Sequence, residues 1–228
     1  MQIVEIFGSR QGEGLWTGTV STFVRVGGCH LRCRFCDTPY TWGEPTEGEN
    51  LSVEEILGRV LLLGHEHVVL TGGEPMLFPE MVPLTKQLES QGYTITIETA
   101  GTSDLPVRCH LMSISPKFSN STPLEADENT IRRHEENRNH PEVVRAFMER
   151  YNYQLKFVID VPSDLEETEI FLKQFSDVAP DRVFFMPQGV TEEELKSREP
   201  WITDYCKNHG YLYCPRMQII WYGNKRRT

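Results

Sequence analysis

The chain has 228 residues, of which 39% are hydrophobic and 10% aromatic, enough to build the core of one domain over residues 1–228. Its 33 acidic residues outnumber its 23 basic ones, and a net charge of −10 argues against direct binding to nucleic acid. No apolar run reaches the roughly 18–20 residues of a membrane span, and the first residues lack the features of a signal peptide, so we expect a cytoplasmic protein.

Short β-branched runs alternate with amphipathic segments along the chain. Strands are predicted over 3–7, 21–26, 67–71, 93–99, 111–115, 154–161, 182–186 and 211–214, and helices over 52–63, 80–90, 163–176 and 191–208. This alternation predicts an α/β fold with a parallel sheet. About six parallel strands are too few for a complete eight-fold barrel, so we expect a partial, open (β/α)6-type TIM-like barrel.

Two segments depart from the alternation. Residues 118–150 are polar and charged, and we expect an exposed helical or mobile insertion there. Residues 215–228 form a C-terminal extension, which ends in a basic run, 225–227, expected to be a solvated terminus.

Four predicted strands end in Gly, Pro or small polar residues, at 71–75, 98–102, 115–117 and 186–189. The carboxyl ends of parallel strands meet at one edge of a sheet, and this edge carries the chemistry in α/β folds. We therefore expect these four ends to share one site.

Three of the six cysteines, Cys29, Cys33 and Cys36, fall within eight residues. The others, at 109, 206 and 214, are expected to be buried or half-buried free thiols. A structural zinc site wants four ligands, and His30 is an awkward fourth because it adjoins Cys29. A 4Fe-4S cluster held by three thiolates is the other possibility, and it leaves one iron open.

The spacing Cys29-x3-Cys33-x2-Cys36, with Phe35 before the last cysteine, resembles the cluster motif of the radical S-adenosylmethionine (SAM) superfamily. The run 71–75 (TGGEP) is similar to that superfamily's GGEP element, which contacts the amine of SAM. The resemblance implies a 4Fe-4S cluster that cleaves SAM to a 5′-deoxyadenosyl radical.

Three further runs narrow the resemblance within this superfamily. Residues 6–14 resemble the EIF-x-S-x-QGEG opening of the 7-carboxy-7-deazaguanine synthase family, 36–42 its CDT-x-Y/F-x-W run, and 113–117 its SPK element. The resemblance implies conversion of 6-carboxy-5,6,7,8-tetrahydropterin to 7-carboxy-7-deazaguanine with loss of ammonia, in queuosine and related 7-deazapurine biosynthesis. It also implies a lyase that is a homodimer and takes electrons from a donor such as flavodoxin.

The resemblance assigns roles to individual residues. Cys29, Cys33 and Cys36 would bind the cluster, and Thr38 would bind Mg²⁺. SAM contacts are implied for Phe35, Cys36, Asp37, Gly73, Glu74, Ser115, Pro116, Lys117, Met186, Pro187, Gln188 and Gly189. Contacts to the pterin substrate are implied for Arg10, Gln11, Gly12, Glu13, Arg25 and Thr71. Arg25 would pair with the substrate carboxylate, and Glu13 would accept from the pterin N–H groups.

The C-terminal extension departs from short family members, some of which present their last residue to the substrate, and here Gln218 or Trp221 is expected to face the site. Ala100 stands where the family often has Asn. Two other interpretations stay open on the sequence: a glycyl-radical-enzyme activase and a non-enzymatic zinc-binding module.

Overall fold

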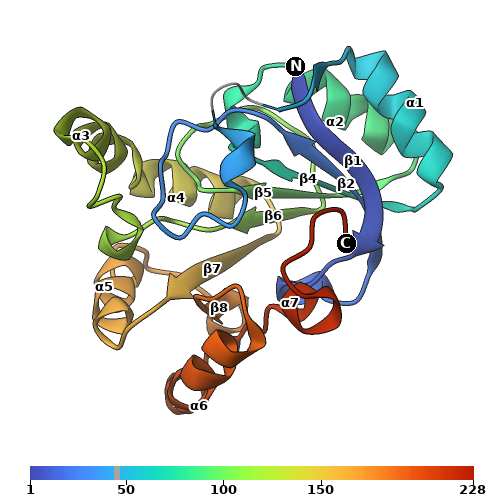
Figure 1. Ribbon diagram of the computed structural model, residues 1–228. Coiled ribbons are helices and arrows are strands. Elements are labelled where there is room, and N and C mark those ends of the chain that lie inside the picture. Colours follow the sequence, from blue (N-terminus) through green and yellow to red (C-terminus); the bar gives the residue numbers. More distant parts are fainter. Residues whose placement is uncertain (44–46) are drawn as a thin grey trace.

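A computed structural model describes residues 1–43 and 47–228, and its helices and strands alternate along most of the chain (Figure 1). They are β1 (Gln2–Arg10), β2 (Val20–Val26), β3 (Glu49–Asn50), α1 (Val53–Leu63), β4 (His67–Gly72), α2 (Met81–Ser90), β5 (Thr94–Thr99), β6 (Leu111–Ile114), α3 (Glu128–Asn137), α4 (Pro141–Arg150), β7 (Tyr153–Ile159), α5 (Ser163–Leu172), β8 (Val183–Pro187), α6 (Glu192–His209), β9 (Leu212–Tyr213) and α7 (Met217–Tyr222). Within the described ranges, no helix has the length and apolar character needed to cross a membrane.

The strands form one sheet in the order β3-β1-β2-β4-β5-β6-β7-β8-β9. Neighbouring strands from β2 to β9 are parallel, which confirms the predicted α/β fold with an open, partial barrel. The first strand instead runs antiparallel to β2, because the connection over residues 11–19 is a short loop rather than a crossover helix. The sheet therefore has a hairpin at its start and a row of parallel strands after it.

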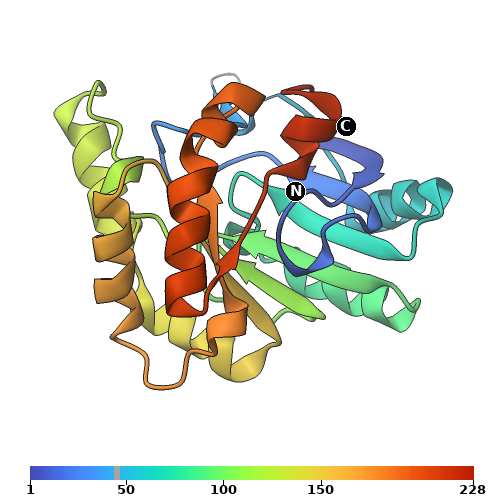
Figure 2. The same cartoon turned by 90° about the horizontal axis from the view of Figure 1, so that it is seen from below.

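Apolar side chains of five helices pack on the same hydrophobic core as the sheet. Ile56 of α1, Leu84 of α2, Phe147 of α4, Phe171 of α5 and Ile202 of α6 are each at most 2% exposed. The aromatic rings of Phe185 and Tyr205, 5.4 Å apart, join β8 to α6, and Figure 2 shows the two elements side by side. This arrangement leaves the opposite side of the sheet to the site.

Helix boundaries follow the local sequence signals. Ser52 and Glu55 form a capping box at the start of α1, and Gly64 ends that helix in the left-handed conformation. Thr191 and Glu194 form a second capping box at the start of α6. The two helices therefore start within one residue of the ranges predicted from the sequence, 52–63 and 191–208.

Residues 118–150 are helical as expected, but they are not uniformly exposed. Val144 and Phe147 of α4 are buried in the core between β6 and β7, and His134 of α3 is 1% exposed. The polar composition hides an apolar stripe on α4, spaced by three residues, that packs as a crossover helix does.

Candidate active site

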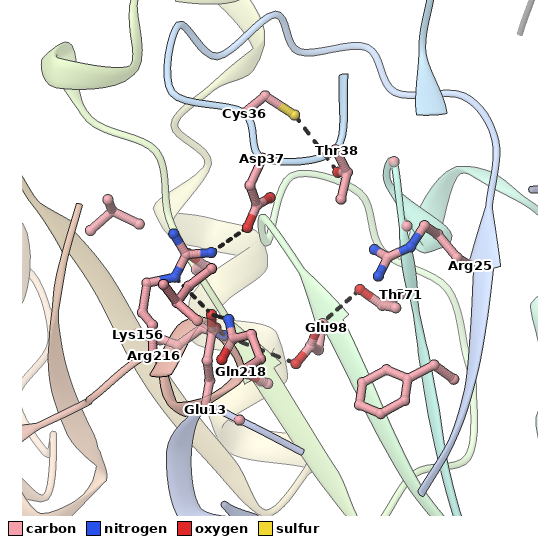
Figure 3. A pocket seen from close by; sticks show the side chains of 18 of the residues that line it. Glu13, Arg25, Cys36, Asp37, Thr38, Thr71, Glu98, Lys156, Arg216 and Gln218 are labelled. Carbon is pink, nitrogen blue, oxygen red and sulfur yellow. Dashed lines mark hydrogen bonds and ion pairs between the residues drawn. The ribbon is translucent and has the colours of Figure 1, made fainter. Parts of the chain in front are cut away.

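The carboxyl ends of the parallel strands open into one pocket, with a volume of about 310 Å³ (Figure 3). All four strand ends singled out in the sequence contribute to its lining, through Thr71, Glu98, Ser115 and Met186 among others. The loop that carries the three clustered cysteines forms a further wall. One site therefore gathers these motifs, as the parallel strand order predicts.

Two glycines bring the end of β4 against the cysteine loop. A Cβ atom on Gly73 would lie 2.0 Å from the carbonyl oxygen of Gly28, and one on Gly72 (φ +132°) would lie 2.4 Å from Val26 backbone atoms. Gly73 N–H donates to the Val26 carbonyl at 3.0 Å, and Glu74 N–H donates to the Gly28 carbonyl at 2.9 Å. The GGEP run thus holds the base of the cysteine loop through backbone contacts that no larger residue permits.

The three clustered cysteines are free thiols that line the same pocket. Two of the sulfur atoms accept hydrogen bonds: the Leu31 N–H lies 3.4 Å from Cys29 Sγ, and the Trp42 indole N–H lies 3.3 Å from Cys36 Sγ. Burial raises the pKa of Cys29 to about 12 and that of Cys33 to about 11. Such thiols ionise readily only beside bound positive charge, and an iron–sulfur cluster supplies it.

A single zinc ion fits this loop poorly. Thiolates that share one zinc lie about 4 Å apart, given Zn–S bonds of about 2.3 Å. Within residues 1–43 and 47–228, no three His, Cys, Asp or Glu side chains form a group that could hold a metal ion. His30 is also engaged elsewhere, with its Nε2 atom 2.9 Å from Thr102 Oγ1. In the described part of the chain, three free thiols without a fourth ligand fit a 4Fe-4S cluster, which three thiolates hold with one iron left open.

The segment after β6 supports the cysteine loop from outside. Arg32 N–H donates to His134 Nδ1 at 3.1 Å, so the proton of this imidazole is on Nε2, which lies 2.9 Å from Ser121 Oγ. The Ser121 hydroxyl in turn donates to the Phe118 carbonyl at 2.6 Å. Burial lowers the pKa of His134 to about 4 and keeps it neutral, as an acceptor at Nδ1 requires.

Glu74 is 1% exposed, and its carboxylate oxygens accept hydrogen bonds from within the protein. Its carboxylate accepts from Met76 N–H at 3.0 Å, from the Thr99 hydroxyl at 2.7 Å and from Ala100 N–H at 2.7 Å. Burial raises its pKa despite these donors. In this structure Glu74 therefore orders the ends of β4 and β5 around the pocket.

The opposite wall carries two carboxylates and a buried cation. Lys156 Nζ pairs with Glu13 Oε2 and lies 4.0 Å from Glu98 Oε1. Glu98 also accepts from the Gln11 amide at 3.1 Å and the Thr71 hydroxyl at 2.9 Å. Burial alone would raise the pKa of Glu13, but Lys156 and Arg216 outweigh it and lower that pKa. Glu13 is therefore ionised at neutral pH.

Arg25 reaches the pocket from β2 beside another buried carboxylate. Its Nε donates to Glu5 Oε1 at 2.7 Å, and Glu5 is 1% exposed. Tyr40 OH donates to the same oxygen at 3.2 Å. Among the described residues, none hydrogen-bonds to the two terminal nitrogens of Arg25, and Figure 3 shows the guanidinium turned toward the pocket.

The C-terminal run, 225–227, is exposed as expected, but it also contacts the pocket. The Arg226 guanidinium lies 3.8 Å from the centre of the Tyr40 ring, and Arg226 and Arg227 approach Glu5 Oε2 at 3.6 and 3.4 Å. Residues 223–228 line the pocket, and Figure 1 shows the C-terminus beside β1 and β2. The run is exposed to solvent, as expected, and the additional finding is that ion pairs to buried Glu5 hold it along the rim of the pocket.

Most residues proposed from the sequence lie in the pocket lining. They are Arg10, Gln11, Gly12, Glu13, Arg25, Cys29, Cys33, Phe35, Cys36, Asp37, Thr38, Thr71, Gly73, Glu74, Ser115, Lys117, Met186 and Gln188. Pro116, Pro187 and Gly189 do not contribute to it, although Gly189 O accepts a bond from a lining residue. Gln218 faces the site as expected, whereas Trp221 is outside the lining.

Sequence reasoning missed Glu98, Lys156 and Arg216. Glu98 stands in one of the strand ends that the sequence singled out, so alternation along β5 could have indicated it. Lys156 and Arg216 both pair with Glu13, which lies more than 140 positions away from each in the chain, so no local pattern indicates them. The three scattered cysteines are buried or half-buried, as expected.

Comparison with known proteins agrees with this geometry. The family model of the radical SAM superfamily matches residues 23–152. A 7-carboxy-7-deazaguanine synthase of Rhodopirellula baltica is 45% identical over 228 residues, covering 99% of this chain and 88% of the relative. A protein of the same name from Halobacterium salinarum is 38% identical, covering 100% and 93%.

Solved structures point the same way. QueE from Escherichia coli superposes with a TM-score of 0.72 at 25% identity, covering 94% of this chain and 92% of that one. Streptococcus suis SuiB bound to S-adenosylmethionine shares the fold at a TM-score of 0.53 and 14% identity, covering 88% and 56%. Identity of 45% across nearly the whole length, together with the cysteine and GGEP loops in one pocket, places this chain in the 7-carboxy-7-deazaguanine synthase family of radical SAM enzymes.

Proposed function

We propose that this chain converts 6-carboxy-5,6,7,8-tetrahydropterin to 7-carboxy-7-deazaguanine and ammonia, as a lyase of 7-deazapurine biosynthesis. The observation that carries the proposal is the pocket itself, where three free cysteines face a wall of paired carboxylates and a buried arginine. The full-length relatives that bear the synthase name favour this reaction over the activation of a glycyl-radical enzyme.

Cys29, Cys33 and Cys36 would hold a 4Fe-4S cluster, and SAM would lie beside it. When bound, the cluster and SAM supply the 5′-deoxyadenosyl radical that starts the rearrangement. Phe35, Asp37 and the backbone at Gly73 would contact SAM from the cysteine loop and the end of β4. Ser115, Lys117, Met186 and Gln188 would complete the SAM side of the pocket, with Pro116, Pro187 and Gly189 shaping the two turns. Glu74 would act by fixing these walls.

The substrate would lie between Arg25 and the two carboxylates. A pterin presents a row of amino and ring N–H donors at one edge, and the side-chain oxygens of Glu13 and Glu98 are matching acceptors. The free nitrogens of Arg25 would take the substrate carboxylate at the other end. Gln11, Gly12, Arg10 and Thr71 line the space between these groups.

Thr38 would supply a hydroxyl to a Mg²⁺ ion. Its Oγ1 atom lies 3.8 Å from Cys36 Sγ on the pocket wall, between the cysteine loop and Arg25 in Figure 3. An oxygen site with few protein ligands is typical of a hard cation such as Mg²⁺. The ion would bind the substrate carboxylate and so fix its orientation.

We further propose that the chain works as one domain in the cytoplasm, as a homodimer that takes electrons from a donor such as flavodoxin. Six free cysteines fit a reducing compartment. The support for dimer and donor is the family resemblance alone.

The decisive experiment is anaerobic turnover of the carboxy-tetrahydropterin with SAM and a reductant. We expect product and ammonia from the wild-type protein. Replacing Cys29, Cys33 or Cys36 by Ala should abolish SAM cleavage and lower bound iron, while the matched control Cys109→Ala keeps both. Loss of iron in Cys109→Ala would contradict the three-ligand assignment.

Arg25 tests the substrate side separately. Losing one partner of a buried charge pair costs on the order of 2–5 kcal/mol, so Arg25→Ala should lose most product while keeping cluster and SAM. Arg25→Lys should recover only part, since an ammonium lacks the planar fork. Wild-type product per SAM cleaved in Arg25→Ala would remove Arg25 from the site.

A further inference from the structure

Arg216 bonds to three separate segments of the chain at the pocket. It is 6% exposed and precedes α7 in the C-terminal extension. Its Nε donates to Glu13 Oε1 at 3.1 Å, its Nη1 donates to the Gly189 carbonyl at 2.5 Å, and its Nη2 donates to Asp37 Oδ2 (Figure 3). Each nitrogen thus has its own acceptor, from a different part of the chain.

The three acceptors belong to the two ligand sites of the proposed function, on which this inference rests. Asp37 follows the cluster ligand Cys36, and Gly189 ends the turn after β8, on the side proposed for SAM. Glu13 lies on the wall proposed for the pterin. A planar guanidinium presents donors in a rigid fork and can hold all three at once, whereas an ammonium group cannot.

The bonds hold the two walls unequally. Glu13 is also held by Lys156 and by the Gln218 amide at 2.6 Å. The Asp37 side chain is 41% exposed, and among the described residues its ion-pair partner is Arg216. Burial would lower the pKa of Arg216, but Asp37 and Glu13 outweigh it and raise that pKa. The position of Asp37 therefore follows that of Arg216, which in turn follows Glu13.

We propose that Arg216 is a positioning residue that couples SAM binding to substrate binding. A ligand that orders Glu13 fixes Arg216, and Arg216 then holds Asp37 and the 186–189 turn in place for SAM. The conformational entropy of these segments is lost only once when both ligands bind, so each ligand strengthens the binding of the other. By reciprocity, SAM tightens the pterin site by the same factor.

The test measures SAM affinity of the reconstituted, unreduced enzyme with and without saturating 6-carboxy-5,6,7,8-tetrahydropterin, so that no turnover occurs. In the wild type we expect substrate to tighten SAM binding by about fivefold or more, a usual size for coupling between sites. In Arg216→Lys the ratio of the two dissociation constants should fall toward one. Arg182→Lys is the matched control, because Arg182 is half-buried and donates to Asn152 Oδ1, outside the pocket lining. It should keep the wild-type ratio.

A second variant covers the case in which Arg216→Lys does not fold. Asp37→Ala cuts the same link from the SAM side, and it should also bring the ratio toward one even if it weakens SAM binding itself. A wild-type ratio of one, or a full ratio in Arg216→Lys or Asp37→Ala, would overturn the inference. Product formation by the wild type is measured in the same preparation, and its absence would count against the proposed function instead.

Discussion

Lys156 offers a direct test of the charge arrangement in the pocket. Its side chain is 7% exposed, pairs with Glu13 and lies 4.0 Å from Glu98 Oε1. Burial would lower the pKa of Lys156, but the two carboxylates outweigh this and raise it. Both Lys156 and Glu13 are therefore charged at neutral pH, and Lys156→Met would leave the carboxylates without their shared cation.

The expected loss is large. Two unit charges 4 Å apart attract by about 4 kcal/mol at an effective dielectric constant of 20. Removing one partner of a buried pair costs about 3–5 kcal/mol, because the remaining charge stays desolvated. Because Glu13 keeps Arg216 and the Gln218 amide as partners, we expect Lys156→Met to lower the free energy of unfolding of the apoprotein by the lower end of this range, about 3 kcal/mol, at pH 7. Without Lys156 the pKa of Glu13 rises, so protonation at lower pH should narrow the gap to the wild type.

Urea denaturation of the apoprotein at pH 7 and pH 5 measures this loss. The matched control is Lys196→Met, since the Lys196 side chain is 68% exposed and pairs with Glu192 on the surface of α6. That control should change little, as exposed pairs do. If Lys156→Met proved as stable as Lys196→Met at pH 7, the claim that a buried charge pair stabilises this wall would be refuted.

Three other predictions concern single side chains. Thr38→Ala should weaken the Mg²⁺ dependence of turnover while SAM still binds, and an unchanged Mg²⁺ response would remove Thr38 from the metal site. Trp42→Phe removes the N–H donor to Cys36 Sγ and should make the midpoint potential of the cluster more negative in an EPR-monitored titration; an unchanged potential would count against that bond. Burial, with His110 adding to it, lowers the pKa of His67 to about 4, so the unfolded chain takes up this proton first and stability should rise between pH 5 and pH 7. His67→Gln should flatten that rise in denaturation curves and His209→Gln should not, whereas equal slopes in both variants would disprove the His67 contribution.

Most of the fold and site that could be predicted came from motifs of residues close together in the sequence. Cys29 to Cys36 lie close in the sequence, and the GGEP run directly follows β4, so spacing alone indicated both. The parallel order of the sheet then follows from alternation, because crossover helices return each strand to the same direction. The site could be located for the same reason, as parallel strands end at one edge.

Contacts between distant residues could not be predicted in this way. Lys156 meets Glu13 across 143 positions and Arg216 meets it across 203. On the sequence each is an ordinary basic residue, and no periodicity distinguishes it from one that faces solvent. The tail residue Arg226 likewise finds its partners, Glu5 and Glu47, about 180 or more positions away in the chain.

The charges of the pocket are divided between its two ends, and this division determines how a substrate lies. Around buried Glu5 stand three arginines, Arg25, Arg226 and Arg227, and exposed Glu47 neutralises only one of them, so this end has excess positive charge. At the other end stand three carboxylates, Glu13, Glu98 and Asp37, with Lys156 and Arg216 as their ion-pair partners, so this end presents carboxylate acceptors. A molecule with a carboxylate at one end and N–H donors at the other is favoured in one orientation and disfavoured in the reverse. A carboxylated pterin is such a molecule, and the field of the pocket would orient it.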